Sequence, residues 1–173
     1  NDPDRFLLAL MTPRKTREDV VALFSFNHEI AKTRNVVSGT QIGLIRLQWW
    51  RDAIWVIYVG KTPREHQVIK PLAEAITRHD LSLELFDNLI YAREFDLEGV
   101  APADINGLFN YCDYTNTPLN QLSLKVLGKE EEIEATRQTS INYGLLRIIK
   151  SLPYNLSKRI VFIPKILLVS HNL

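Results

Sequence analysis

Helical spacing of apolar residues, interrupted at intervals by glycine and proline, is the feature that most constrains the fold of this chain. Between the interruptions, apolar side chains recur every three or four positions, as Val20, Leu23 and Phe24 do, which places them on one face of a helix. The one β-like run is residues 160–163, just before Pro164. The pattern predicts an all-α fold of about seven helices, with residues 1–173 forming a single domain.

Turn formers and caps set the expected ends of these helices. We expect helices over residues 5–11, 16–37, 41–58, 62–78, 82–97, 102–127 and 129–152. Thr16 is the expected N-cap of the second helix, with Asp19 at the distance that a capping box requires. Pro71 is expected to kink or break the fourth helix, Pro118 to break the sixth, and Pro153 to end the seventh.

Composition excludes several classes of protein. The chain is 46% hydrophobic, which is enough for a real core, and 24% charged, which is ordinary for a globular domain. A net charge of +1 gives no reason to expect a nucleic-acid partner. The single cysteine, Cys112, cannot form an intrachain disulfide and is expected to be a buried, unreactive thiol. We see no signal-peptide pattern at the N-terminus, and no stretch has the roughly 18–20 apolar residues of a membrane-spanning helix.

Charge is unevenly distributed along the chain. Residues 1–134 contain all 20 acidic residues and 15 of the 21 basic ones, a net charge of 15 − 20 = −5. Residues 135–173 contain six basic residues and no acidic one, a net charge of +6. In this segment Arg147, Lys150 and Lys158 stand beside apolar residues. Such a pattern is typical of a segment that docks on a membrane surface or a partner, and equally of a solvated rim around core residues.

Two groups of residues are candidates for a site. His28 and Lys32 are four positions apart on one helical face, so they either line an inward-facing pocket or lie on a solvated surface. Glu94, Asp96 and Glu98 place three carboxylates within five residues. Paired carboxylates can hold Mg²⁺ together with substrate phosphates, but a charged helix end has the same appearance. The sequence leaves both pairs of alternatives open.

Four segments, in this order, resemble the squalene/phytoene synthase family. They are residues 26–29 (FNHE), 46–53 (RLQWWRDA), 108–112 (LFNYC) and 159–164 (RIVFIP). The second and the fourth are the most specific, and the resemblance extends over nearly the whole chain. It implies the isoprenoid synthase fold, an all-α helical bundle that continues in the family beyond the last of these segments. In the family's enzymes this fold joins two prenyl diphosphates head to head.

The chain departs from the enzymes at the positions that carry their chemistry. The resemblance implies two Asp-rich motifs on facing helices, whose carboxylates hold Mg²⁺ against the diphosphate. The first motif falls at His28 and Lys32, and neither side chain suits so hard an ion. The second falls at residues 144–154, within the acid-free segment. The resemblance thus implies that both metal sites are lost, and it leaves Tyr111, which matches an active-site tyrosine, as the catalytic candidate.

A non-catalytic branch of the family shares these departures. The shared features are Phe26-Asn27 with Glu29, residues 46–48 (RLQ) with Trp50, and residues 152–154 (LPY) ahead of Lys158 and Arg159. Members of this branch take part in assembling respiratory NADH:ubiquinone oxidoreductase, complex I. The resemblance therefore implies a scaffold with protein partners in that assembly and no cofactor. It also implies a place on the cytoplasmic or mitochondrial-matrix side, peripheral to the inner membrane.

Two other functions remain open. A divergent prenyltransferase would hold Mg²⁺ with substitute carboxylates drawn from Glu29, Glu94, Asp96 and Glu98. A non-catalytic prenyl-lipid binder would hold an anionic head group with Arg46, Arg51, Arg147 and Lys150. A pocket lined by His28, Lys32 and Arg147 would favour binding, whereas two or more convergent carboxylates would favour catalysis. The full set of candidate pocket residues is His28, Glu29, Lys32, Arg46, Arg51, Tyr111, Arg147 and Lys150.

Overall fold

The fold is built from helices throughout the part of the chain that the computed structural model describes, residues 3–157 and 162–164. The elements are α1 (Pro3–Met11), α2 (Arg17–Ala31), α3 (Thr33–Val36), α4 (Thr40–Tyr58), α5 (Ile69–His79), α6 (Leu83–Glu98), α7 (Ile105–Val126), the 3₁₀ turn η1 (Glu130–Glu132) and α8 (Thr136–Ser157). These residues contain no strand, which confirms the all-α prediction. The predicted β-like run at residues 160–163 lies mostly outside them.

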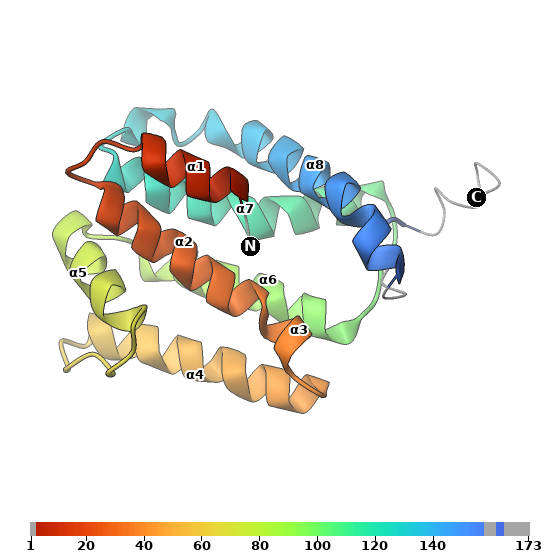
Figure 1. Cartoon of the computed structure of the whole chain (residues 1–173), viewed down its shortest axis with the longest axis horizontal. Helices are drawn as coiled ribbons and strands as arrows, with labels where there is room; N and C mark the ends of the chain where they lie inside the picture. The colour runs from red at the N-terminus through yellow and green to blue at the C-terminus, as the bar shows by residue number, and fades with distance from the viewer. Residues whose placement is uncertain (1–2, 158–161, 165–173) are drawn as a thin grey trace.

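The longer helices form two layers (Figure 1). Helices α4, α6, α7 and α8 follow one another side by side, each packed against the next. Helix α2 lies on this layer and packs against α5, α6 and α7, and α1 packs against α2. The second layer therefore consists of α5, α2 and α1. No helix in the described ranges is long and apolar enough to cross a membrane.

Glycines end the helices where the sequence predicted. Gly60, Gly99 and Gly128 follow α4, α6 and α7 and have φ values of 69°, 69° and 66°. Glycine adopts this left-handed conformation without the steric cost that a Cβ atom imposes. The predicted second helix is divided, because α2 ends at Ala31 and the short α3 begins at Thr33.

The predicted capping box at the start of α2 is wrong. Thr16 precedes the helix but makes no side-chain capping bond; its Oγ1 instead donates to the carbonyl oxygen of Pro13 at 3.3 Å. The carboxylate of Asp19 accepts bonds from Arg78 Nη1 at 2.6 Å and from His79 Nε2 at 2.8 Å. The Asp19 carboxylate, which the local pattern assigned to the N-cap of α2, thus forms an ion pair with α5 instead.

The three prolines do not act as predicted. Pro71 is the third residue of α5, in the first turn, where a backbone N–H has no partner within the helix. The chain from Thr62 to Val68 is irregular, so this helix begins later than expected. Pro118 and Pro153 lie inside α7 and α8, and neither ends its helix.

Side-chain bonds and helix packing surround the turn of α7 that precedes Pro118. Thr115 Oγ1 donates to the carbonyl oxygen of Tyr111 at 2.7 Å, and Asn116 Nδ2 donates to that of Cys112 at 2.9 Å. These bonds reinforce the turn before the proline. Helix α7 also packs against α6, α8 and α2. Packing on several sides offsets the cost of an internal proline, about 3 kcal/mol.

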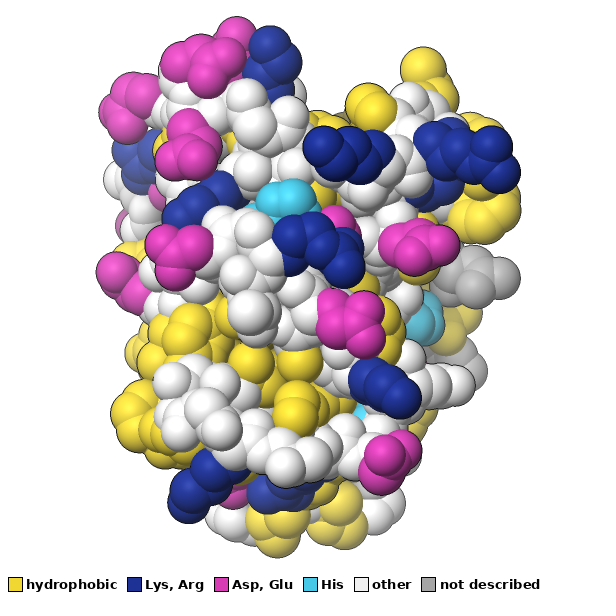
Figure 2. Space-filling view, turned by 90° about the vertical axis from the view of Figure 1, so that its left-hand side faces the viewer, with side chains coloured by type: hydrophobic (Ala, Val, Ile, Leu, Met, Phe, Trp, Pro, Cys, Tyr) yellow, Lys and Arg dark blue, Asp and Glu magenta, His cyan; other side chains and the backbone are white. Residues whose placement is uncertain are grey.

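The acidic residues after Gly128 do not begin the last helix. Glu130, Glu131 and Glu132 form η1, whereas α8 starts at Thr136 and has no acidic residue in its first turn. The expected start at residue 129 is therefore wrong. Figure 2 looks onto the end of the bundle at the left of Figure 1, and Asp and Glu side chains gather at its upper left. Glu130, Glu131 and Glu132 are exposed to solvent and do not lie at the start of α8, where a helix dipole would favour them.

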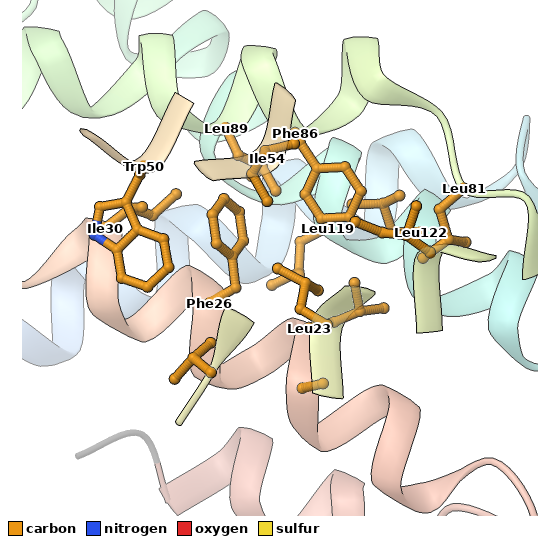
Figure 3. Packing of buried hydrophobic residues seen from close by; sticks show 14 of the residues in the cluster. Leu23, Phe26, Ile30, Trp50, Ile54, Leu81, Phe86, Leu89, Leu119 and Leu122 are labelled. Atoms are coloured by element: carbon orange, nitrogen blue, oxygen red, sulfur yellow. The ribbon is translucent and has the colours of Figure 1, made fainter. Parts of the chain in front are cut away.

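The core lies between α2, α4 and α6 (Figure 3). Phe26 is fully buried, and its ring makes edge-to-face contacts with Trp50 at 5.6 Å and with Phe86 at 5.4 Å between centroids. Leu23 and Ile30 bury the turns of α2 on either side. Edge-to-face aromatic pairs contribute about 0.5–1.5 kcal/mol beyond the area that they bury. This cluster fixes α2, which carries the candidate site residues His28 and Glu29.

Candidate functional site

A cavity with a volume of about 770 Å³ lies between the two layers, with walls from α1, α2, α7 and α8. It receives five of the eight predicted pocket residues: His28, Glu29, Lys32, Tyr111 and Arg147. The predicted helical face that carries His28 and Lys32 therefore faces a cavity. Arg46, Arg51 and Lys150 do not line it.

The three predicted residues outside the cavity wall have other partners. Arg46 lies behind the wall and donates from Nη2 to Glu29 Oε2 at 3.1 Å. Arg51 bonds Asp87 at 3.1 Å and Glu94 at 3.0 Å, between α4 and α6. Lys150 pairs with Asp4 at 3.3 Å near the protein surface. An anionic ligand in the cavity would therefore not reach Arg51 or Lys150 directly.

Glu29 is the acidic residue among those that line the cavity. Its side chain is only 12% exposed and is held by two cations: Lys32 Nζ at 2.5 Å on one carboxylate oxygen and Arg46 Nη2 at 3.1 Å on the other. Both oxygens are thus engaged by fixed positive charges. Since four lining residues are Lys or Arg, namely Arg5, Lys32, Arg93 and Arg147, the cavity wall carries a net positive charge.

Tyr111 belongs to a buried polar network at the cavity wall. Its Oη donates to Asp96 Oδ1 at 2.7 Å. Arg93 donates from Nη1 to Asp96 Oδ2 and from Nη2 to Asn27 Oδ1, both at 3.3 Å. Burial, reinforced by the negative charge of Asp96, raises the pKa of Tyr111 well above its usual range. The phenol therefore stays protonated and acts as a hydrogen-bond donor near neutral pH.

The three predicted carboxylates on α6 do not meet in one place: Glu94 and Glu98 line a second cavity of about 330 Å³, whereas Asp96 belongs to the polar network at the wall of the first. Asp96 is buried and bonded to Tyr111 and Arg93. Glu94 is half-buried and bonded to Arg51, whereas Glu98 is exposed. Positions 94 and 96 differ by about 200° around a helix, so their side chains leave it in nearly opposite directions. Within residues 3–157 and 162–164, no three His, Cys, Asp or Glu side chains are grouped so that they could hold a metal ion.

Sequence reasoning missed the contribution of α1 to the cavity. Arg5 is 8% exposed, and its Nη2 donates to Asn116 Oδ1 on α7 at 3.1 Å. Its guanidinium also lies over the rings of Phe24, at 5.9 Å, and Tyr143, at 5.7 Å. Spacing places Arg5 and Ala9 on one face of α1 but does not mark that face as the buried one, so the sequence carried no signal for this contribution.

Cys112 is buried beside the cavity wall, as predicted. The residue is fully inaccessible, and burial raises the pKa of its thiol to about 11. A thiol with this pKa has very little of the nucleophilic thiolate at neutral pH. Cys112 therefore contributes to the packing of α7.

Comparison with known proteins places the chain in a family. The squalene/phytoene synthase family model matches residues 1–173. One relative is NADH dehydrogenase (ubiquinone) complex I, assembly factor 6, of Homo sapiens. It is 31% identical over 173 residues, which is 99% of this chain and 52% of that protein. Its homologue in Dictyostelium discoideum is 28% identical over 151 residues, 86% of this chain and 42% of that protein.

A second kind of relative is an enzyme. Presqualene diphosphate synthase of Rhodopseudomonas palustris is 24% identical over 159 residues, 90% of this chain and 56% of the enzyme. The chain thus spans about half the length of the curated relatives that it matches. The match over the full sequence and the all-helical architecture agree with the expected fold. The chain belongs to the squalene/phytoene synthase family.

Proposed function

We propose that this protein is a non-catalytic member of its family and acts as a scaffold or assembly factor for respiratory complex I. The observation that carries the proposal is that both carboxylate oxygens of Glu29 are paired with cations. This carboxylate lines the cavity and is neutralised by Lys32 and Arg46. His28 and Lys32 stand where the resemblance places metal-binding carboxylates. The higher identity to assembly factor 6 than to presqualene diphosphate synthase supports the same assignment.

We infer that these side chains do not fit an Mg²⁺–diphosphate centre. Mg²⁺ prefers oxygen ligands and is usually held by one or two carboxylates together with substrate phosphates. A metal ion at Glu29 would have to compete with Lys32 and Arg46, whose ion pairs already engage both oxygens of this nearly buried carboxylate. Asp96 would likewise have to give up Arg93 and Tyr111. No catalytic step through the metal follows from this arrangement.

The assembly role brings expectations about partners and location. Partners are proteins of the complex I assembly pathway, and no nucleic acid is involved. The protein would lie on the cytoplasmic or mitochondrial-matrix side, at the surface of the inner membrane. The name of the human relative supports the first expectation. The net charge of +6 in residues 135–173 supports attraction to an anionic membrane surface.

Calorimetric titration with farnesyl diphosphate, with and without Mg²⁺, tests the loss of catalysis. We expect no condensed product, and any binding should be indifferent to Mg²⁺. Mg²⁺-dependent binding or a condensed product would overturn the proposal and favour a divergent prenyltransferase.

Complementation tests the assembly role directly. In cells that lack the full-length protein, we expect low levels of assembled complex I on native gels and recovery with the wild-type gene. Tyr111→Phe removes the catalytic candidate hydroxyl and should restore assembly as well as the wild type does. Phe26→Ala, which damages the core, is the negative control. Failure of Tyr111→Phe at normal protein levels would count against a scaffold.

A prenyl-lipid binder is the second candidate, and the composition of the cavity favours it. Phe6, Val21 and Phe24 contribute apolar surface, while Lys32 and Arg147 contribute positive charge. An anionic head group on an apolar chain matches both features. Lys32→Gln and Arg147→Gln should each lower the affinity for farnesyl diphosphate about tenfold, which is the loss of one charge-assisted hydrogen bond. Lys129→Gln, at an exposed site away from the cavity, should not.

A further inference from the structure

The outward face of α4 exposes large apolar side chains along the edge of the bundle. Ile42 and Ile45 near its start are 53% and 69% exposed, and Trp55 and Val59 near its end are 56% and 42% exposed. The opposite face is buried against the core by Leu47 and by residues 50, 53 and 54. Helix α4 forms the lower edge of the molecule in Figure 1. Hydrophobic side chains also mark the lower edge of Figure 2, at the end of the bundle where α4 terminates.

These exposed positions form a continuous stripe. From Ile45 they recur at intervals of three, four, three and four residues, through Gln48, Asp52, Trp55 and Val59. This is the spacing by which one helix packs along another. With 19 residues, α4 is about 28 Å long, so the stripe extends over nearly its whole length. We call these residues, together with Ile42, the α4 stripe.

The α4 stripe has an internal two-fold arrangement. Ile45 and Trp55 lie five residues before and after Trp50, and Gln48 and Asp52 lie two residues before and after it. Ile42 and Val59 lie eight and nine residues away. A two-fold axis passing near residue 50 therefore superposes apolar ends on apolar ends and the polar centre on itself. We propose that the α4 stripe is a homodimer interface, in which α4 packs antiparallel against α4 of a second copy.

The polar centre selects the antiparallel orientation. Within one copy, Gln48 Nε2 donates to Asp52 Oδ1 at 2.7 Å, and both side chains are exposed. In the antiparallel pair, Gln48 faces Asp52 of the second copy, so each amide donor meets a carboxylate acceptor. In a parallel pair, Asp52 would face Asp52, and like charges repel. A polar pair in an otherwise apolar seam is a known device for fixing register and orientation.

The apolar ends supply the attraction. Ile45 of one copy lies against Trp55 of the other, and Ile42 lies against Val59. Each contact occurs twice, because a two-fold interface is made from the same surface on both copies. One helix per copy gives a small interface, since specific complexes generally bury at least about 1,000 Å² in total. We therefore expect reversible dimerisation with a dissociation constant on the order of micromolar.

Reciprocal charge variants test this pairing by analytical ultracentrifugation of the full-length protein over a range of concentrations. The wild type should sediment at twice the monomer mass at high concentration. Ile45→Lys and Trp55→Glu each place charges against an apolar partner and should be monomeric. The double variant sets the new lysine of each copy opposite the new glutamate of the other, so it should recover the dimer. Within one helix these two positions are about 15 Å apart, so they cannot pair in the monomer.

Cysteine cross-linking provides a second readout. Ile45→Cys with Trp55→Cys should give a disulfide-linked dimer under mild oxidation, whereas Ile45→Cys alone should not, because two copies of residue 45 lie far apart in the antiparallel pair. Cys112 is fully buried and does not interfere. Leu10→Glu, on the exposed surface of α1, is the matched control and should leave the dimer intact. Circular dichroism confirms that each variant is folded.

Three outcomes would overturn the proposal. The first is a wild type that stays monomeric at all concentrations. The second is a dimer that forms equally in Ile45→Lys and in Trp55→Glu, or a dimer that is lost in the control variant Leu10→Glu. The third is a double charge variant that folds but does not dimerise. Formation of a disulfide-linked dimer by Ile45→Cys alone would overturn the proposal as well. None of these measurements depends on catalysis or on complex I, so their failure leaves the proposed function unaffected.

Discussion

Substitution of Gly144 tests how closely α7 and α8 approach each other. A Cβ atom at Gly144 would lie 2.8 Å from Cys112 Cβ and 2.7 Å from Asn116 Nδ2, both on α7. The Cys112 contact would have to lengthen by 3.4 − 2.8 = 0.6 Å to reach ordinary van der Waals distance. Because Cβ moves only with its backbone, the two helices must separate. The shift would also disturb the bond that Asn116 makes with Arg5 at the cavity.

The magnitude follows from two opposing terms. Replacing glycine by alanine inside a helix gains about 1 kcal/mol through the unfolded state and helix propensity. Overpacking a close contact costs about 1–3 kcal/mol. For Gly144→Ala we therefore expect a net loss of about 1 kcal/mol in the free energy of unfolding, the difference between these two terms.

Two other glycines in helices provide matched controls. At Gly107 an added Cβ meets nothing closer than 3.5 Å, so Gly107→Ala should stabilise by about 0.5–1 kcal/mol. At Gly43 the Cβ would lie 2.6 Å from Leu97 Cδ2, but that methyl is the end of a flexible side chain, so the change should be near zero. Urea unfolding should rank the variants 107, 43, 144, with roughly 1 M between the extreme midpoints for an m-value of about 2 kcal/mol per M. If Gly144→Ala is as stable as Gly107→Ala, the close approach of α7 and α8 is wrong.

Three further predictions follow from buried groups. Phe26→Ala should cost about 3–5 kcal/mol in urea unfolding, whereas Phe6→Ala, at a side chain 64% exposed, should cost almost nothing. Asp19→Asn should cost about 2 kcal/mol by thermal unfolding because it weakens the bonds to Arg78 and His79; equal stability of Asp19→Asn and the exposed control Asp80→Asn would contradict this. The folded Cys112 has a pKa of about 11 against an ordinary value of 9.0, so the unfolded state releases this proton first, and stability should fall as pH rises from about 9 to about 11. Cys112→Ala should make that fall shallower, and an unchanged slope would count against a buried thiol.

Helix identity was predictable from the sequence because it depends on local spacing and on residues with special backbone geometry. Gly60, Gly99 and Gly128 all have positive φ, and each stands where the pattern predicted a helix to end. These signals need no knowledge of the rest of the fold. The proline predictions failed for the opposite reason. Whether a helix continues past Pro118 depends on what packs around it, and α7 packs against α2, α6 and α8.

Helical spacing predicted the part of the candidate site that α2 carries; the predicted residues Tyr111 on α7 and Arg147 on α8 also line the cavity. The face that carries His28 and Lys32 follows from helical spacing, and it does line the cavity. Arg46 was expected in the same pocket but lies behind it, since its guanidinium is held by Glu29. Arg51 was also expected in the pocket but instead donates hydrogen bonds to Asp87 and Glu94. Such partners come from other helices, and spacing within one helix carries no information about them.

Helix α1 contributes a positive charge to the cavity because it buries an arginine and exposes most of its apolar side chains. Its buried positions are Arg5 and Ala9, while Phe6, Leu7, Leu8, Leu10 and Met11 are each between 49% and 83% exposed. A pattern of apolar residues predicts the reverse orientation. Arg5 is accommodated because Asn116 accepts its hydrogen bond and two aromatic rings face its guanidinium. A cation is therefore held at the cavity wall by contacts with α2, α7 and α8, and this favours an anionic occupant over a bound metal ion.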